Sequence, residues 1–290
     1  MPNGIIIIDK PADWTSMDVC AKIRGILREK RVGHGGTLDP MATGVLPVFV
    51  GQATRAVEFA ENGSKEYVAG LRLGLATDTQ DVTGTTIGTH EAAVSREMLA
   101  SVLPQFTGEI QQLPPMYSAI KINGRKLCDV ARKGGEVERT PRGITVYELE
   151  ILEQTGPADF TLRCVCSKGT YIRTLCHDIG RALGCGGCMA SLRRTMAAGF
   201  TLSQAVSIGD VQEQGETLLL PTDRYFAKYP AYTITAERQE KRCRNGNPVD
   251  ASDCPDGIYR VYGRGGEFLC LSRASNGILT SIKNFLERNI

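Results

Sequence analysis

The sequence has few of the features that mark secreted or membrane-bound proteins. Of its 290 residues only 6% are aromatic, and there is a single tryptophan. No run approaches the ~18 apolar residues of a membrane-spanning helix. The opening residues, MPNGIIIIDK, lack the basic start and the cleavage site of a signal peptide. We therefore expect a cytoplasmic protein without a membrane partner.

The common catalytic and metal signatures are missing as well. No HExxH, GxSxG or EF-hand spacing is present, and VGHGGTLDP lacks the lysine of a phosphate-binding P-loop. The ten cysteines include one CxxC pair, Cys185 and Cys188, but a zinc ribbon needs a second pair. Reduced, buried thiols are the simpler interpretation. We expect no metal and no cofactor, with a cysteine-ligated metal site left open as an alternative.

Positive charge is concentrated in two segments. Residues 121–142 hold seven lysines and arginines against three acids, a net charge of +4, and residues 163–194 hold six against one, a net charge of +5. The whole chain carries only +2, so the remainder is acidic. Two basic segments on an otherwise acidic protein favour a polyanionic partner, although such segments can also simply be solvated.

Apolar periodicity predicts an α+β fold with a mixed or antiparallel sheet. Lys65–Leu73 alternates as a half-buried strand does, and residues 4–9 (GIIIID) are typical of a buried strand. Thr15 and Asp18 have the spacing of a helix capping box. Paired strand patterns with interspersed helices, rather than regular alternation, indicate this fold class. Further strands are expected at residues 46–50, 144–153, 160–166 and 189–195, and helices at 52–61, 95–106 and 170–183.

The chain divides into unequal parts. Residues 111–143 are basic, rich in turn residues and poor in apolar periodicity, which predicts an excursion from the core with a short helix near 125–132. Several short strand patterns follow a boundary at residues 218–226. We expect a large domain over residues 1–228, including the insert at 111–143, and a small β-rich domain over 229–290.

Residues 32–48, VGHGGTLDPMATGVLPV, place one carboxylate, Asp39, between glycines and a proline. The glycines free the backbone, and Pro40 disfavours the helical region for Asp39. A plain turn, a phosphate cradle and the mount of a catalytic carboxylate are all compatible with this loop. Arg173 would keep Asp39 charged if the two met, and Tyr67 and Tyr171 offer flat surfaces for a nucleobase. The residues alone do not show that these groups meet.

The chain resembles the bacterial tRNA pseudouridine-55 synthases, the TruB-type pseudouridine synthase family, over about residues 4–225. The last sixty residues resemble, less sharply, the small PUA-like RNA-binding domain of family members. The segments that carry the resemblance are GHGGTLDPMATGVLPV, IIIIDKPADWTS, KEYVAGLRLG, PPMYSAIKINGRKL, VERTPR, CSKGTYIRTLCHDIGRALGCG and SLRRTMAAGFTL.

The resemblance implies a reaction and three catalytic residues. Uridine at position 55 of the tRNA T-loop would be flipped out of its stack, and an aspartate-dependent rearrangement would exchange its C–N glycosidic bond for a C–C bond. Asp39 falls on the catalytic aspartate, Arg173 on the arginine that pairs with it, and Tyr67 on the tyrosine that stacks on the target base. The isomerisation exchanges no electrons and no net water, so it requires no cofactor.

The resemblance also implies roles for residues that hold the substrate. His34 falls on a histidine that helps to open the T-loop, Tyr171 on an active-site tyrosine and Leu192 on an apolar residue of the pocket. Lys10 and Pro11 fall in a motif whose part is more structural than chemical. The insert at residues 111–143 resembles a loop that closes over the RNA.

The implied partner is the T-arm of tRNA, with no guide RNA, and a monomer suffices. Gly35 departs from the family pattern, because many members have threonine there, and we expect a looser loop beside His34. Two alternatives stay open. One is a guide-RNA-dependent synthase acting on ribosomal RNA, against which the basic insert counts, since a stand-alone enzyme must grip its own RNA. The other is an RNA chaperone or binding module that no longer catalyses.

Overall fold

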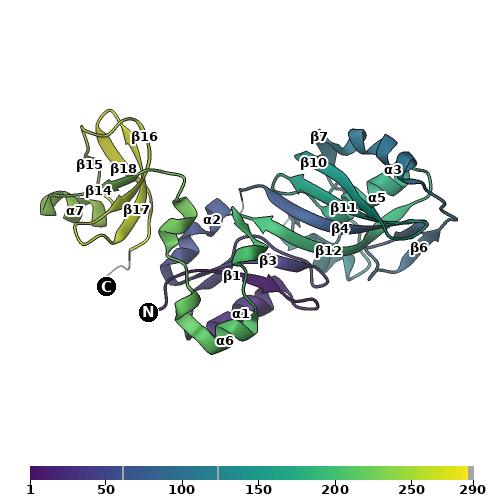
Figure 1. Ribbon diagram of the computed structural model, residues 1–290, viewed down its shortest axis with the longest axis horizontal. Helices are drawn as coiled ribbons and strands as arrows, with labels where there is room; N and C mark the ends of the chain where they lie inside the picture. Colours follow the sequence, from purple (N-terminus) through teal and green to yellow (C-terminus); the bar gives the residue numbers. More distant parts are fainter. Residues whose placement is uncertain (61, 123, 287–290) are drawn as a thin grey trace.

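A nine-stranded mixed sheet forms the body of the protein (Figure 1). This computed structural model describes residues 1–60, 62–122 and 124–286. All strand pairs of this sheet are antiparallel except β3–β12, which are parallel. The predicted α+β class with a mixed sheet is therefore confirmed. The main path runs β1 (Gly4–Lys10), β3 (Thr43–Val50), β12 (Gly187–Ala197), β4 (Lys65–Leu73), β11 (Asp159–Cys166), β10 (Arg142–Gln154) and β7 (Gly108–Gln112); β2 (Val32–His34) pairs with β3, and β13 (Phe200–Thr201) with β12.

Burial of the strands follows their sequence patterns. On β4, Tyr67, Ala69, Leu71 and Leu73 are buried and the residues between them are not, as the alternation predicts. On β1 the four isoleucines are all buried, because two face one apolar cluster and two face another. A strand covered on both faces has no polar side, which explains its unbroken apolar run.

The helices expected at residues 95–106 and 170–183 begin within two residues of their predicted starts, whereas the first half of the segment 52–61 is a 3₁₀ turn. In α1 (Ser16–Leu27), the Thr15 hydroxyl accepts from the Asp18 amide at 3.0 Å and the Asp18 carboxylate accepts from the Thr15 amide at 2.9 Å, a complete capping box. The helix expected at residues 95–106 is α3 (Arg96–Val102) followed by a 3₁₀ turn. The helix expected at residues 170–183 is α5 (Ile172–Ala182), which packs on β12 and β4. The shorter helices are α2 (Val57–Ala60), which follows a 3₁₀ turn, and α6 (Ile208–Gln214).

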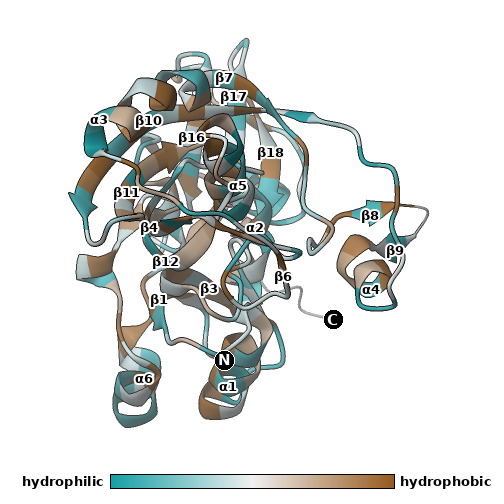
Figure 2. Ribbon diagram, turned by 90° about the vertical axis from the view of Figure 1, so that its right-hand side faces the viewer, coloured by the Kyte–Doolittle hydropathy of each residue, from teal (hydrophilic) through white to brown (hydrophobic). Residues whose placement is uncertain are grey.

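Two small substructures leave the main sheet. The segment between β7 and β10 projects from the body and contains β8 (Lys121–Ile122), β9 (Arg125–Lys126) and α4 (Leu127–Ala131) (Figure 2). A two-stranded ribbon of β5 (Leu75–Thr77) and β6 (Thr86–Thr89) follows β4. The turn between β5 and β6 returns to the body, where Val82 N donates to the Met189 carbonyl at 3.0 Å.

A second sheet of five strands lies at the C-terminal end of the chain (Figure 1). One apolar cluster, which includes Ile234, Val261 and Leu269, lies within this sheet and α7, whereas Leu271 and Phe285 belong to a cluster shared with the main sheet. The division of the chain at residue 228 stays a prediction. The order of this sheet is β14 (Ala231–Thr233), β16 (Gly257–Tyr262), β17 (Phe268–Ser275), β18 (Ile278–Asn284) and β15 (Val249–Asp250), with α7 (Glu237–Arg244) beside it.

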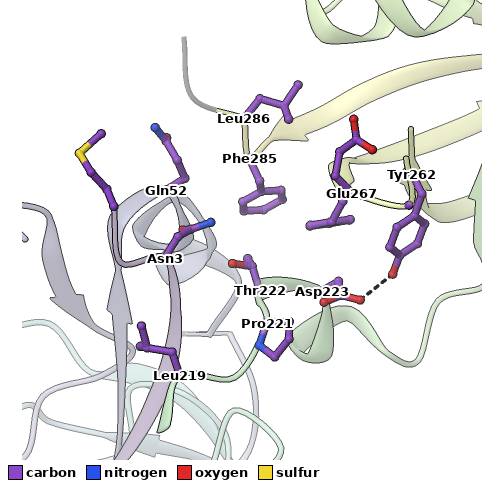
Figure 3. Close-up of a pocket in the computed structure, with 13 residues that line it drawn as sticks. Asn3, Gln52, Leu219, Pro221, Thr222, Asp223, Tyr262, Glu267, Phe285 and Leu286 are labelled. Carbon is purple, nitrogen blue, oxygen red and sulfur yellow. Dashed lines mark hydrogen bonds between the residues drawn. The ribbon is translucent and has the colours of Figure 1, made fainter. Parts of the chain in front are cut away.

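Aromatic side chains join the second sheet to the body. Phe226, Phe268 and Phe285 pack with ring centroids 5.1–6.1 Å apart, and Arg55 Nη1 donates to the Asn284 carbonyl at 2.9 Å. Figure 3 shows the cavity of about 690 Å³ at this seam, with the Tyr262 hydroxyl donating to Asp223 at 2.7 Å. The seam is thus part apolar and part polar.

Candidate active site

The loop that carries Asp39 is fixed at several points by the start of α1. Ser16 Oγ accepts from the Leu38 amide at 2.8 Å and donates to the Leu38 carbonyl at 3.2 Å. The Asp13 amide donates to the Pro40 carbonyl at 2.9 Å, and the Asp39 carbonyl accepts from Ala42. Both sides of Asp39 are therefore held, which makes this loop a stiff mount rather than a mobile tip.

Lys10 holds the same loop from beneath. Its side chain is fully buried, and its Nζ donates to the carbonyls of Pro11, Trp14 and Pro40 at 2.8, 2.5 and 3.1 Å. The three donors of the ammonium group thus all have partners. Burial is the main cause that lowers the pKa of Lys10 to about 8. The role of this lysine in the structure is to tie the chain before α1 to the loop of Asp39.

Arg194, on β12, holds the other flank of the loop. It is completely buried, and its guanidinium donates to the carbonyls of Val45 at 2.7 Å, Gly36 at 3.1 Å and Thr37 at 3.4 Å. The backbone passes very close to it at Gly44, which has φ +101°. A Cβ added there would lie 2.1 Å from the Arg194 carbonyl oxygen, so only glycine fits.

Asp39 and Arg173 form the two-point contact expected of a catalytic pair. Arg173 Nε lies 2.9 Å from Asp39 Oδ2, and Nη2 donates to Asp39 Oδ1 at 3.3 Å. Arg173 is 5% exposed in the first turn of α5, whereas the Asp39 side chain is 35% exposed. Arg173 also donates to the carbonyls of Thr79 at 3.1 Å and Tyr117 at 2.8 Å. The planar guanidinium of Arg173 is held by these contacts, and it in turn holds the partly accessible carboxylate of Asp39 in one orientation.

A second, buried carboxylate lies behind Arg173. Asp81 Oδ2 is 3.8 Å from Arg173 Nε, and Asp81 Oδ1 accepts from Thr79 Oγ1 at 2.9 Å and from the amide and hydroxyl of Thr83 at 2.9 and 2.6 Å. The guanidinium therefore has two carboxylates within 4 Å of its Nε, one buried and one accessible. We refer to residues 78–85, between β5 and β6, as the Asp81 turn.

The other predicted site residues lie near this pair on neighbouring elements. Tyr67 on β4 and Leu192 on β12 belong to one apolar cluster with Leu38, the neighbour of Asp39. Burial raises the pKa of Tyr67 to about 12, so its phenol is neutral at physiological pH. Tyr171 directly precedes α5, and its amide and carbonyl bond to the side chain of Gln112 at 2.8 and 3.1 Å. Its pKa is also raised, mainly by burial.

His34 ends β2 at the edge of the same loop. Burial, with a smaller effect of the nearby Arg194 charge, lowers the pKa of His34. Its Nδ1 is buried and has no hydrogen-bond partner among the described residues. Beside it, a Cβ at Gly35 would lie 2.8 Å from Ala60 Cβ and 3.0 Å from Phe49 Cε2. Phe49 and Ala60 therefore fill the space that a side chain would occupy, and the looser loop expected at Gly35 stays a prediction.

The cysteines do not form a metal centre in the part of the chain that the structure describes. All ten are free thiols, and no group of three or more His, Cys, Asp or Glu side chains in residues 1–60, 62–122 and 124–286 could hold a metal ion. Cys185 and Cys188 are both buried, and burial raises the pKa of Cys188 to about 11. Within the same described ranges no helix is long and apolar enough to cross a membrane.

Comparison with known proteins adds an independent observation. The model of the TruB family pseudouridylate synthase N-terminal domain matches residues 24–172, and that of the tRNA pseudouridylate synthase B C-terminal domain matches residues 173–226. The chain belongs to the TruB family. Among curated members, tRNA pseudouridine synthase B of Alkaliphilus oremlandii is 44% identical over 90% of this chain and 88% of that protein. The synthase of Clostridium kluyveri is 38% identical over 98% of this chain and all of that protein.

Solved structures related to this TruB-family chain include proteins from larger assemblies. A chain of a Cbf5–Nop10–Gar1 complex is 29% identical with a TM-score of 0.74, covering 99% of this chain and 86% of that one. A chain of an H/ACA ribonucleoprotein bound to a substrate RNA containing 2'-deoxyuridine is 27% identical with a TM-score of 0.72, at the same coverage. The fold is thus shared with a chain of a Cbf5–Nop10–Gar1 complex and with a chain of an H/ACA ribonucleoprotein.

The sequence indicated Asp39, Arg173 and the residues near them in this TruB-family site, but not two of its buried supports. Asp39 and Arg173 are in contact, and Tyr67 and Leu192 share an apolar cluster with Leu38. Tyr171 precedes Arg173 by two residues at the start of α5, and His34 ends β2 five residues before Asp39. Asp81 and Arg194 were not singled out. The segment DTQDVTG shows two aspartates among threonines, a pattern typical of an ordinary turn, and Arg194 stands in a basic segment with no sign of burial. The roles of all these residues in catalysis are proposals, developed below.

Proposed function

We propose that this protein is a tRNA pseudouridine synthase that isomerises the uridine at position 55 of the T-loop to pseudouridine. The observation that carries the proposal is the accessible Asp39 carboxylate held at two points by a buried arginine. The naming of its relatives as tRNA pseudouridine synthase B supports tRNA as the substrate. In this assignment Asp39, Arg173 and Tyr67 are catalytic, and His34, Tyr171 and Leu192 bind the substrate.

The reaction needs few groups because substrate and product are isomers. The bond from ribose C1′ to uracil N1 breaks, the base turns, a bond from C1′ to C5 forms, and the proton on C5 is lost while N1 gains one. A carboxylate placed at the sugar and base assists this rearrangement. The fixed loop holds Asp39 in position before the substrate arrives, and such preorganisation lowers the barrier.

The remaining residues would hold the flipped nucleotide. The target uridine must leave the stack of the T-loop, which costs a few kcal/mol. The neutral ring of Tyr67 would support the base, with stacking worth ~1–3 kcal/mol. The lowered pKa of His34 favours its neutral form, and this side chain would occupy the space that the base leaves. Tyr171 and Leu192 would complete the wall of the pocket.

The basic segments at residues 121–142 and 163–194 would bind the phosphates of the T-arm. The first lies in the projecting segment with β8, β9 and α4 (Figure 2), where it can reach RNA beyond the site. In the second segment the exposed Arg181 and the partly exposed Arg193 would make these contacts, because Arg173 and Arg194 are buried. Such contacts position a substrate without reading its sequence. They predict that tRNA affinity falls steeply with salt, and an affinity unchanged between low and high salt would contradict this assignment. The five-stranded C-terminal sheet is proposed as a PUA-like RNA-binding domain.

One chain supplies every group named above, so we propose a monomer that acts in the cytoplasm without a guide RNA. The similarity to chains of ribonucleoprotein complexes makes a guide-dependent enzyme the second candidate. Unmodified tRNA transcript incubated with the pure protein, without metal, cofactor or other RNA, separates the two. Pseudouridine mapped at position 55 alone, and lost in Asp39→Asn with tRNA binding retained, is the expected result. No product despite tight binding would reject the proposal.

A further inference from the structure

The turn that holds Arg173 contains a residue in an uncommon backbone conformation. Gln80 has φ +65°, a region that glycine, asparagine and aspartate enter far more readily than glutamine. Its neighbours on both sides contact the guanidinium: the Thr79 carbonyl accepts from Arg173 Nη1, and Asp81 Oδ2 lies 3.8 Å from Nε. Residues held in this region persist when surrounding contacts maintain them, and they concentrate at functional sites.

The contact that holds the side chain of Gln80 comes from the residue after Arg173. The Thr174 hydroxyl donates to Gln80 Oε1 at 2.7 Å, and Thr174 is 2% exposed. Thr174 and Arg173 are consecutive in the first turn of α5. Two consecutive residues of the helix thus hold the three consecutive residues 79–81 of the Asp81 turn.

The main chain of Gln80 is fixed on its other side. Met189 N on β12 donates to the Gln80 carbonyl at 3.0 Å, and Val82 N donates back to the Met189 carbonyl at 3.0 Å. The Asp81 turn is therefore clamped between β12 and α5. Backbone hydrogen bonds to β12 fix one side of the turn, and the hydrogen bonds from Arg173 to Thr79 and from Thr174 to Gln80 fix the other.

We propose that Gln80 and Thr174 are positioning residues for the reaction: their hydrogen bond fixes the Asp81 turn against α5 and so orients the Arg173 guanidinium toward Asp39. Both act through Arg173, because Thr174 follows it in α5 and the two neighbours of Gln80, Thr79 and Asp81, contact its guanidinium. The inference rests on the proposed function, because it concerns the rate at which Asp39 works.

The test separates this hydrogen bond from simple packing. Thr174→Val keeps the branched shape of the side chain and removes the donor, whereas Thr174→Ser keeps the donor. Gln80→Gly removes the acceptor and also relieves the positive φ, which offsets part of the cost of leaving the buried Thr174 hydroxyl unpaired. For each variant the single-turnover rate on tRNA transcript at saturating enzyme, the tRNA Kd and the melting temperature are measured.

We expect Thr174→Val and Gln80→Gly each to lower the single-turnover rate about tenfold, because small misplacements of catalytic groups reduce rates strongly. The tRNA Kd should stay within about twofold, and Thr174→Ser should return most of the rate. The double variant should be no slower than the slower single variant, since both remove one interaction.

Several results would overturn the inference. Parental rates in Thr174→Val and Gln80→Gly would show that the bond does not position Arg173. Equal losses in Thr174→Ser and Thr174→Val would assign the effect to helix packing, and additive losses in the double variant would show that the two residues act separately. In all these cases the parent is active and the proposed function stands. A parent that makes no pseudouridine would overturn the proposed function and this inference together.

Discussion

Replacing Arg173 with lysine keeps a positive charge at the site but removes the planar fork that contacts Asp39. The arginine reaches Asp39 through Nε and Nη2 and two carbonyls through Nη1 and Nη2. A lysine has one nitrogen, so it cannot place donors on both carboxylate oxygens and also satisfy the carbonyls of Thr79 and Tyr117. The variant therefore tests geometry separately from charge.

The size of the effect follows from the contacts that are lost. One hydrogen bond to a charged group contributes roughly 1.5–3 kcal/mol. If that amount is lost only in the transition state, the rate of the chemical step falls between about tenfold and about 150-fold, at 1.4 kcal/mol for each factor of ten. We expect Arg173→Lys to lose activity within this range while tRNA binding changes little, because Arg173 is buried behind the carboxylate.

Release of tritium from uridine labelled at C5 measures the chemical step, because C5 loses its hydrogen when it bonds to the ribose. The assay uses excess enzyme, so that product release does not contribute. Arg72→Lys is the matched control: Arg72 also contacts a carboxylate, Asp159 at 2.8 Å, but this pair is exposed on β4 and β11. A rate for Arg173→Lys within twofold of both parent and control would refute the argument that the fork is required.

Three further predictions concern the supports of the site. Tyr67→Leu should slow the single-turnover rate more than Tyr67→Phe, since only phenylalanine keeps the stacking worth ~1–3 kcal/mol, and equal rates would exclude stacking. The pKa of Lys10 is about 8 in the folded protein and 10.5 in the unfolded chain. As the pH increases through this interval, the unfolding free energy of the parent should therefore rise relative to that of Lys10→Met, by roughly 3 kcal/mol in all. A pH-independent difference between the two proteins in urea unfolding would contradict the lowered pKa of this buried lysine. Gly35→Thr should destabilise the fold by about 1–3 kcal/mol through overpacking, and adding Ala60→Gly to this variant should restore part of the lost stability. An unchanged denaturation midpoint in Gly35→Thr would show that the loop can shift.

Elements whose pattern is local could be predicted from the sequence. The alternation of β4 and the capping box of α1 need only neighbouring residues, and both appear as expected. The continuous apolar run of β1 likewise indicated burial on both faces. In each case the physical cause, a burial periodicity or a local hydrogen bond, lies within a few residues of the chain.

Features that depend on distant segments could not be predicted in this way. The parallel pairing of β3 with β12 joins residues 43–44 to residues 193–194, and no local pattern specifies it. The burial of Arg194 and Asp81 follows from such pairings, so their sequence context gave no indication of it. The need for glycine at position 35 could not be predicted from local sequence either, because Ala60 and Phe49 occupy the space that a side chain would need.

The bond from Arg194 to the Val45 carbonyl spans 149 residues of chain, and this separation bears on how the protein is made. A ribosome synthesises the loop of Asp39 early, but the side chain that fastens its far flank emerges only after about two thirds of the chain. Contacts of such long sequence separation form late, after the segments between them have been synthesised and closed. A nascent or truncated chain that ends before β12 therefore lacks an assembled carboxylate mount, and fragments of this protein would not modify RNA before synthesis has passed residue 194.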